Sequence, residues 1–229
     1  MTVLDLETTA VDAAVRLETA SAEEVLAWAA GTFGDRFCIT SSMADGILAH
    51  LASRVIPGVD VVFLDTGYHF PETLGTRDAV AAMYDVNVVT VVPELTVAEQ
   101  DARHGRDLFA SSPDRCCELR KVVPLQKALA GYAAWASGVR RDESPTRRDT
   151  PVVAWDARKG KVKISPLARW TQADVDRYAA EHGVLINPLQ QLGYASIGCA
   201  PCTRAVAPGE DPRAGRWAGR SKIECGIHL

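Results

Sequence analysis

Cysteine is the residue type in this chain with the most chemical potential, and it occurs six times in 229 residues. The positions are Cys38, Cys116, Cys117, Cys199, Cys202 and Cys225. The stretch from Met1 to Glu7 is acidic where a secretory signal would be basic, and no apolar run is long enough to span a bilayer. We therefore expect a cytoplasmic protein with reduced thiols, which favours metal binding or catalysis over a disulfide framework.

Four of the cysteines form two close pairs. Cys116 and Cys117 are adjacent, and the spacing of Cys199 and Cys202 lets two thiolates reach one metal centre. Neighbouring side chains on a helix diverge, so an adjacent pair suits a cluster with separate iron atoms better than one tetrahedral ion. The pairs favour an iron-sulfur cluster. The alternatives are a zinc site, or thiols that are free or disulfide-bonded.

Cys225 is followed by only four residues, and it has no cysteine at ligand spacing. Four cations precede it, at Arg213, Arg216, Arg220 and Lys222. Cations favour the thiolate form, and a terminal arm can carry a thiol to a substrate. We interpret Cys225 as a nucleophile; an unused thiol or a redox sensor is the alternative. Cys38, among apolar neighbours, is interpreted as an inert core residue.

Lys121 follows Cys117 by one helical turn. A cation beside a thiolate-rich cluster can offset its negative charge and still reach an anionic substrate. The alternative is an ordinary surface lysine on an exposed helix.

Alternating strands and helices must position these groups. The pattern predicts strands at 37–40, 59–64, 87–92 and 133–137, and a hairpin of 152–156 with 161–164 at a sheet edge. It predicts helices at 22–33, from 47 onward, and at 71–84, 96–104, 117–129 and 171–182. Residues 1 to about 20 carry no signal strong enough to place. The alternation implies a mostly parallel α/β sheet with helices on both faces and a ligand site at the carboxyl ends of the strands.

The turns after these strands have the chemistry to bind a nucleotide. Ser41 and Ser42 follow the first strand at a helix start, and Asp65-Thr66-Gly67 follows the second. After the fourth strand, residues 138–148 contain four arginines, which can clamp phosphate or sulfate in a bidentate manner. A solvated charged loop is the alternative reading of this stretch.

Composition limits the remaining classes. The chain is 47% apolar and 24% charged, as in a globular protein, and its net charge of -4 gives no overall basic footprint for nucleic acid. No internal repeat or low-complexity linker occurs. We divide the chain into an α/β domain at 1–205 and a mobile segment at 206–229 that carries Cys225. Homo-oligomerisation is possible.

Several motifs together resemble a known family, the assimilatory adenylyl-sulfate reductases. They are Leu64 to Thr73, Cys116 to Lys121, Arg140 to Arg147, Gly198 to Arg204 and Glu224 to Leu229, and the resemblance covers about residues 35 to 229. It implies an adenine nucleotide α-hydrolase-like fold of the pyrophosphatase-loop type. It also implies that Cys116, Cys117, Cys199 and Cys202 hold a [4Fe-4S] cluster.

The resemblance further implies a reaction. Cys225 attacks the sulfur of adenosine 5'-phosphosulfate, AMP leaves, and an S-sulfocysteine remains, from which thioredoxin or a similar dithiol releases sulfite. The positions that match the family's phosphosulfate-binding residues are Lys121, Arg140, Arg147, Arg213 and Arg216. The positions that match its nucleotide pocket are Ser41, Asp65 and Gly138.

One departure from the family and three alternatives stand beside this expectation. Related loops often carry glycine after the matching serine, whereas this loop reads Ser41-Ser42-Met43-Ala44-Asp45. The two cysteine pairs favour adenylyl sulfate over its 3'-phosphorylated form, whose reductases typically lack them. An ATP pyrophosphatase-type sulfur-transfer enzyme would favour a Ser-Gly-Gly loop, which is absent. A non-catalytic metal-binding or electron-transfer protein would need neither Cys225 nor the arginines.

Overall fold

Short, nearly continuous apolar segments form the central sheet. The structure, a computed structural model, describes residues 5–220, 222 and 224–227. The strands are β1 (Phe37–Thr40), β2 (Val59–Leu64), β3 (Val86–Val91), β4 (Ala134–Ser137), β5 (Val153–Asp156) and β6 (Lys161–Ile164). They form one sheet in the order β3-β2-β1-β4-β6-β5. β1 is therefore central, as expected for a strand buried on both faces.

The pairing confirms the mostly parallel sheet. β1 runs parallel to β2 and β4, with Ile39 opposite Val61 and Cys38 opposite Trp135. β3 and β6 extend the parallel array, and β5 alone is antiparallel, paired with β6 at the edge. The predicted hairpin and its edge position are therefore correct.

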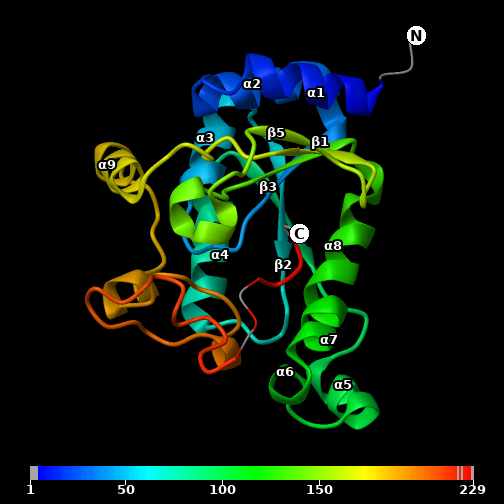
Figure 1. The fold of residues 1–229 in the computed structure, drawn as a ribbon, viewed down its shortest axis with the longest axis vertical. Helices are drawn as coiled ribbons and strands as arrows, with labels where there is room; N and C mark the ends of the chain where they lie inside the picture. The colour runs from blue at the N-terminus through cyan, green and yellow to red at the C-terminus, as the bar shows by residue number, and fades with distance from the viewer. Residues whose placement is uncertain (1–4, 221, 223, 228–229) are drawn as a thin grey trace.

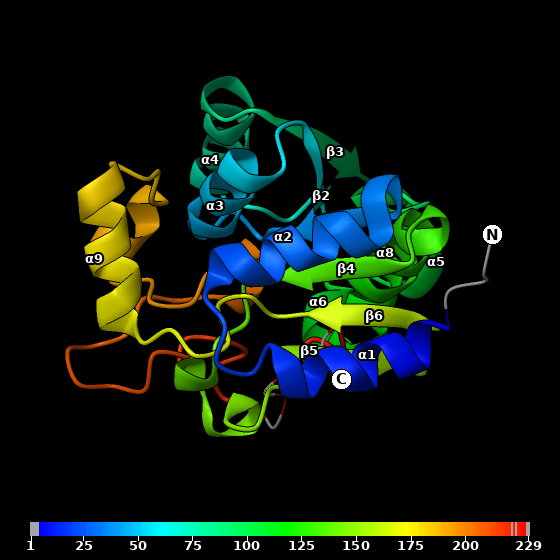
Figure 2. The same cartoon turned by 90° about the horizontal axis from the view of Figure 1, so that it is seen from above.

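One face of the sheet is covered by α1 (Leu6–Arg16), α2 (Ala22–Phe33), α3 (Ile47–Val55) and α4 (Pro71–Met83). Alternate strand residues such as Ile39, Val61 and Ala136 point into this layer and form one large buried core with it. Figure 2 shows α1 and α2 lying alongside β4 and β6, with their axes close to the strand direction. Side chains alternate between the two faces along a strand, so the residues between those just named point to the opposite face of the sheet. The same strands therefore present a different set of side chains there.

The second face is covered by α8 (Val123–Ala128) and by the end of the chain. Its buried cluster is small and consists of Cys38, Val62, Leu125, Leu129 and Trp135. Ile227 packs against this cluster from the C-terminal tail. In Figure 1 the red end of the chain runs between β2 and α8. Helices on both faces confirm the predicted layer arrangement.

The region that carries the first cysteine pair contains the predicted helix at 117–129, but the helical turn with the cysteines starts earlier, at Pro113. It is built from α5 (Val97–His104), α6 (Leu108–Ser111), α7 (Pro113–Cys117), a π-helical turn (Glu118–Val122) and α8. Both cysteines end α7 instead of starting a helix, because Pro113 occupies the first helical position upstream. Such π turns widen the helix locally and are frequent at functional sites.

The remaining helical elements are short except for α9 (Gln172–His182), which the sequence predicts well. The 3-10 turns are Gly34–Arg36, Leu129–Gly131, Arg141–Glu143, Pro145–Arg147, Pro188–Leu192 and Ala200–Cys202. Residues 183–220 contain no α-helix or strand, in agreement with the loop-rich C-terminal segment expected from the sequence.

The helix α1 lies in the stretch that sequence analysis left unplaced. Asp5 caps it by accepting a hydrogen bond from the Glu7 backbone N-H at 3.1 Å. Its buried residues are Ala10 and Ala13, which contact the β5–β6 edge of the sheet. Alanines give a weak apolar pattern, so the sequence signal was faint.

Candidate active site

Three turns predicted to bind nucleotide lie at one edge of the sheet. Ser41, Asp65 and Gly138 directly follow β1, β2 and β4, whose parallel directions bring their carboxyl ends together. The Ser41 hydroxyl accepts from the Met43 N-H at 3.1 Å, and Asp65 accepts from the Gly67 N-H at 3.0 Å. Both side chains thus order their own turns.

Met43 explains how the first turn forms without glycine. Its φ is 56°, in the left-handed region that usually selects glycine. The side chain is fully buried in the core, and the Asn187 amide donates to the Met43 carbonyl at 2.9 Å. Packing and this hydrogen bond therefore hold a conformation that the residue itself disfavours.

Two polar atoms near this edge are buried without a hydrogen-bond partner among the described residues. They are the Ser137 hydroxyl, at the end of β4, and Nη1 of Arg140, two residues after Gly138. Arg140 also donates through Nη2 to Gln172 at 2.7 Å. Because buried polar atoms are normally satisfied, these two atoms are available to a polar ligand.

The two cysteine pairs meet in one pocket. Cys116 and Cys117 at the end of α7 face Cys199 and Cys202 of the 3-10 turn at Ala200–Cys202. The pocket is also lined by Tyr68, Phe109, Pro113, Arg120, Lys121 and Trp217. A backbone hydrogen bond from Ala200 N to Tyr68 O, at 2.7 Å, fixes the second pair beside the turn after β2.

The charges in this pocket interact strongly. Burial, followed by the neighbouring thiolates, raises the pKa of Cys116 to about 12. Burial also acts on Cys199, but the Lys121 ammonium and the Thr66 hydroxyl, 3.3 Å from the sulfur, lower the pKa of Cys199. In return, although burial disfavours the ammonium, the thiolates of Cys199 and Cys225 raise the pKa of Lys121. Lys121 is therefore a central cation and not an isolated surface lysine.

The donor set fits a group that binds several thiolates. Four converging thiolates repel one another unless a positively charged centre binds them. The Trp217 indole N-H is buried in the pocket wall with no partner among the described residues, so it is available to a sulfur acceptor. Across the described ranges, no three His, Cys, Asp or Glu side chains are close enough together to hold a metal ion. The four cysteines line one pocket, and a cluster with separate iron corners would need ligands that converge in this way.

Arg120 ties the first cysteine pair to the turn after β2. Only 3% of the residue is exposed, and its guanidinium donates to the Thr66 carbonyl, to Leu95 O at 3.2 Å and to Gln100 Oε1 at 3.1 Å. The sequence singled out its neighbour Lys121 instead. Arg120 gave no separate signal because its role depends on carbonyls from distant parts of the chain.

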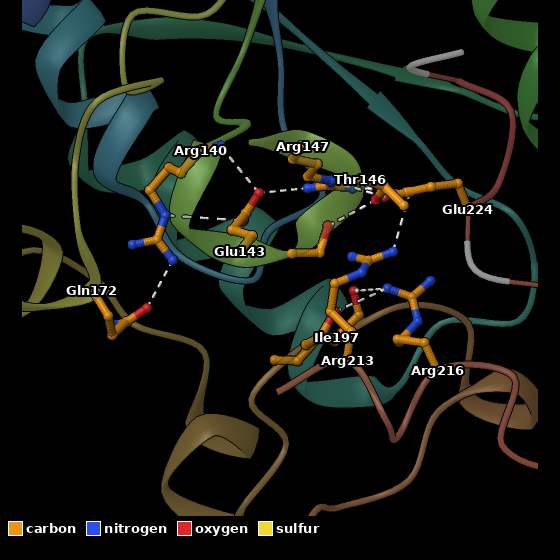
Figure 3. Close-up of polar contacts among 11 residues, drawn as sticks. Arg140, Glu143, Thr146, Arg147, Gln172, Ile197, Arg213, Arg216 and Glu224 are labelled. Atoms are coloured by element: carbon orange, nitrogen blue, oxygen red, sulfur yellow. Dashed lines mark hydrogen bonds and ion pairs between the residues drawn. The ribbon is translucent and has the colours of Figure 1, made fainter. Parts of the chain in front are cut away.

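Two of the predicted anion-binding arginines meet around one carboxylate. Glu224 accepts from Arg147 Nε at 2.9 Å and pairs with Arg213 Nη2 at 3.1 Å (Figure 3). Glu143 lies in the same loop as Arg147 and contacts both Arg147 and Arg140. The loop at 138–148 is therefore not simply a solvated charged loop.

Arg216 lies beside this pair and has room only because residue 198 is glycine. Its Nη1 donates to Ser196 Oγ and to Ile197 O, each at 3.3 Å. A Cβ atom on Gly198 would overlap the Arg216 guanidinium. The buried Nε of Arg216 has no hydrogen-bond partner in the described part of the chain. A donor left unsatisfied in this way supports an anion-binding role.

The tail carries Cys225 to the thiol pocket. Lys222 pairs with Asp114 of α7, and Arg220 donates to the carbonyls of Phe109 and Ala110 at 2.6 and 2.8 Å. The charge of Cys225 contributes to the pKa values of both Lys121 and Cys117, and the adjacent Gly226 lies beside Val122, the residue after Lys121. The last two residues of the predicted tail motif, His228 and Leu229, lie outside the described residues. The mobility of the tail and the division at 205/206 stay predictions.

Sequence reasoning missed Glu224, Glu143 and Trp217 as site residues. Glu224 belongs to the motif around Cys225, but only the fold reveals that its partners are Arg147 and Arg213. Trp217 carried no local signal. The functional roles of the named site residues remain predictions; the structure contributes their positions.

Comparisons with known proteins agree with this arrangement. Residues 37–205 match the phosphoadenosine phosphosulfate reductase domain family. A protein from Streptomyces coelicolor called adenosine 5'-phosphosulfate reductase is 67% identical over 224 residues, covering 98% of this chain and 95% of that protein. One from Rhodococcus opacus with the same name is 55% identical over 234 residues, covering 98% of this chain and 95% of that protein.

Solved structures give the same fold. Phosphoadenylyl-sulfate reductase from Candida auris, a phosphate complex, has a TM-score of 0.73 and 30% identity, covering 90% of this chain and 99% of that one. Candida glabrata FMN adenylyltransferase, with FAD and pyrophosphate, has a TM-score of 0.54 and 12% identity, covering 87% of this chain and 74% of that one. The second likeness concerns the fold alone and agrees with the adenine nucleotide α-hydrolase-like class. With its paired cysteines, cationic cluster and parallel sheet, the chain belongs to the phosphoadenosine phosphosulfate reductase domain family.

Proposed function

We propose that this protein reduces adenosine 5'-phosphosulfate to sulfite and AMP in sulfate assimilation, with Cys225 as the nucleophile. The observation that carries the proposal is the position of Cys225, on a tail beside Lys121 and next to the arginine cluster. The name of the Streptomyces coelicolor relative supports the choice of substrate. We assign the reaction to the cytoplasm; among the described residues, no helix has the length and apolarity to cross a membrane.

The first step is a displacement at sulfur. The Cys225 thiolate attacks the sulfur of the sulfate group, a sulfur–sulfur bond forms, and the bond from sulfur to the bridging oxygen breaks. That oxygen leaves with the electron pair on AMP. A thiolate approaching a dianionic substrate is repelled, and nearby cations reduce this cost. Lys121, Arg213 and Arg216 are the side chains assigned to this task, because Lys121 interacts with the charge of Cys225, and Arg213 and Arg216 interact with the adjacent Glu224.

The second step releases sulfite and needs an external reductant. A thiolate of a dithiol of the thioredoxin class attacks the Cys225 sulfur, which forms a mixed disulfide and expels sulfite. The second thiol of the dithiol then reduces the mixed disulfide and regenerates Cys225. The dithiol loses two electrons and sulfur falls from the +6 to the +4 state, so the electrons balance. We propose thioredoxin or a similar dithiol as the partner.

The nucleotide half of the substrate is assigned to the edge formed by Ser41, Asp65 and Gly138. Arg140 is assigned to its phosphate, because Nη1 of this side chain is buried and unsatisfied among the described residues. The edge also has the Ser137 hydroxyl available. A ligand with both donors and acceptors suits such a place.

The thiol pocket fits a [4Fe-4S] cluster held by Cys116, Cys117, Cys199 and Cys202. When bound, such a group supplies a link between the two cysteine pairs and a compact negative charge opposite Lys121. Lys121 then contacts cluster ligands on one side and substrate on the other. No electron has to pass through the pocket, because the dithiol supplies both.

Intact mass measurement tests the nucleophile. Purified protein is mixed with adenosine 5'-phosphosulfate without reductant and weighed. Wild type is expected to gain one sulfonate, and Cys225→Ser to gain none, while Cys38→Ser serves as a matched control that still gains it. An unchanged wild-type mass would contradict the mechanism.

The same assay separates the two candidate substrates. The family description and the Candida auris structure both name the 3'-phosphorylated nucleotide, so this is the second candidate. We expect faster sulfonation by adenosine 5'-phosphosulfate; the reverse order would identify a phosphoadenylyl-sulfate reductase. Iron and sulfide analysis of anaerobically purified protein, expected to give four of each per chain for one [4Fe-4S] cluster, tests the cofactor separately.

A further inference from the structure

Glu224, the residue directly before Cys225, occupies the centre of the arginine cluster. Its carboxylate forms two bonds to Arg147, from Nε at 2.9 Å and from Nη2 at 3.0 Å, and one contact to Arg213 Nη2 at 3.1 Å. Only 8% of the Glu224 side chain is exposed, and 13% and 14% of the two arginine side chains. Figure 3 shows the carboxylate between the two guanidinium groups.

The carboxylate is charged in this environment. Burial would raise its pKa, but hydrogen bonding and the charges of Arg147 and Arg213 outweigh burial and lower the pKa of Glu224. Conversely, burial and the repulsion of Arg147 lower the pKa of Arg213. Without an anion, this cluster would hold several buried like charges. Glu224 therefore serves as their counter-anion in the structure.

Of these two arginines, Arg213 is also assigned above to the sulfate group of the substrate. A guanidinium binds a carboxylate and a sulfate or phosphate edge through the same pair of donors. Glu224 and substrate thus compete for Arg213. We propose that Glu224 is an internal occupant of the anion site, which the substrate displaces from Arg213 but not from Arg147; this inference rests on the proposed function.

The contacts identify which arginine is exchanged. Arg147 holds Glu224 through two bonds and is itself fixed by Glu143 of the Arg141–Glu143 turn. Among the contacts described for this carboxylate, Arg213 contributes one, through Nη2 at 3.1 Å. When substrate takes Arg213, the bond to Arg147 still holds the tail, so Cys225 stays beside the sulfur. When AMP leaves, Glu224 returns to Arg213 and favours product release.

A simpler role for Glu224 would be to anchor the tail. The tail has other anchors, since Arg220 binds the carbonyls of α6, Lys222 pairs with Asp114, and Ile227 packs on the second face. The two roles make opposite predictions for a variant that loses the charge. An occupant that is removed lets substrate bind more tightly, whereas an anchor that is removed leaves binding unchanged or weaker.

The test uses full-length, cluster-loaded protein with Cys225→Ser, which prevents turnover. Calorimetry measures the binding of adenosine 5'-phosphosulfate and of AMP, with and without Glu224→Gln. We expect Glu224→Gln to tighten adenosine 5'-phosphosulfate binding by about five- to tenfold and AMP binding by less, because AMP carries one anionic group fewer. Equal or weaker binding of adenosine 5'-phosphosulfate overturns the proposal.

Two further variants keep the result specific. Glu210→Gln changes the net charge by the same amount, but Glu210 pairs with Arg204 at 2.5 Å, outside the arginine cluster. We expect Glu210→Gln to leave the binding of adenosine 5'-phosphosulfate unchanged. If it tightens binding as much as Glu224→Gln does, the effect comes from net charge alone and the proposal is refuted. Glu224→Asp keeps the charge but shortens the reach, so it should also bind substrate more tightly; no gain counts against the proposal. Failure of the Cys225→Ser parent to bind adenosine 5'-phosphosulfate at all, together with no mass gain in wild type, refutes the proposed function instead.

Discussion

The two faces of the sheet are covered in different ways. One face packs against α1 to α4 over a continuous apolar core that includes Ile39, Val61 and Ala136. The other holds a small cluster under α8, completed by Ile227 from the tail, and it carries Lys161 and Lys163 on the same side as Trp135. The first face is built for stability. We propose that the tail can leave the second face and return to it, which would suit a reaction in which the nucleophile meets two partners in turn.

The largest effect should come from the first face. Ile39 is fully buried in β1, so Ile39→Ala is expected to lower the free energy of unfolding by about 2–5 kcal/mol through lost contacts and a cavity. Urea unfolding followed by circular dichroism measures it. Val92→Ala, at a residue that is 67% exposed, is the control with a change below about 0.5 kcal/mol. If Ile39→Ala lowers the free energy of unfolding no more than Val92→Ala does, the first face is not the one that provides the stability.

The next effect concerns the arginine cluster at the active site. Gly198→Ala places a methyl group against the Arg216 guanidinium, so we expect Arg216 to move and adenosine 5'-phosphosulfate to bind about tenfold more weakly. Binding is measured in the Cys225→Ser background. Gly75→Ala is the matched control, because a Cβ atom there meets no neighbour within 4 Å. If Gly198→Ala binds as tightly as the control, Arg216 does not contact the substrate.

A smaller effect should depend on pH. Burial and the charge of Lys159 lower the pKa of Lys163 from 10.5 to about 8. Between pH 8 and pH 10.5 the Lys163 amine is neutral in the folded state and protonated in the unfolded state, so unfolding takes up a proton. Burial of the ammonium therefore destabilises the fold fully below pH 8, and this destabilisation disappears above pH 10.5. Lys163→Met should therefore raise the free energy of unfolding at pH 7 by roughly 1–2 kcal/mol. The gain, measured by urea unfolding at several pH values, should shrink toward pH 10.5; a gain independent of pH would assign it to packing alone.

The smallest stability effect should come from the tail. Ile227 is partly buried on the second face, so Ile227→Ala is expected to cost less than about 1 kcal/mol in unfolding free energy. The rate of Cys225 sulfonation should nevertheless fall severalfold, because the tail then docks less often. Stopped-time mass measurement gives this rate. A large stability loss without a rate change would mean that both faces serve stability alone.

Much of the fold was predictable because it is encoded in local patterns. β1 and β2 lie where apolar runs predicted them, and α2 and α9 begin at capping residues that the sequence displays. The helix predicted at 117–129 is confirmed, but it begins earlier, at Pro113, and it contains a π-helical turn that the sequence did not indicate. The helix α1 gave too weak a signal, since its buried positions are alanines.

The candidate site divides in the same way. The sequence by itself determined which residue types are present at which spacing, and from them it predicted the groups for the chemistry: two cysteine pairs, a tail thiol, and arginines in a loop that follows a strand. Only the tertiary structure decided that both cysteine pairs share one pocket with Lys121, and that Glu224 pairs with Arg147 and Arg213. The physical reason is that periodicity and capping act within a few residues. The pairing of Arg147 with Glu224, 77 residues apart, depends on the tertiary fold that brings these two parts of the chain together.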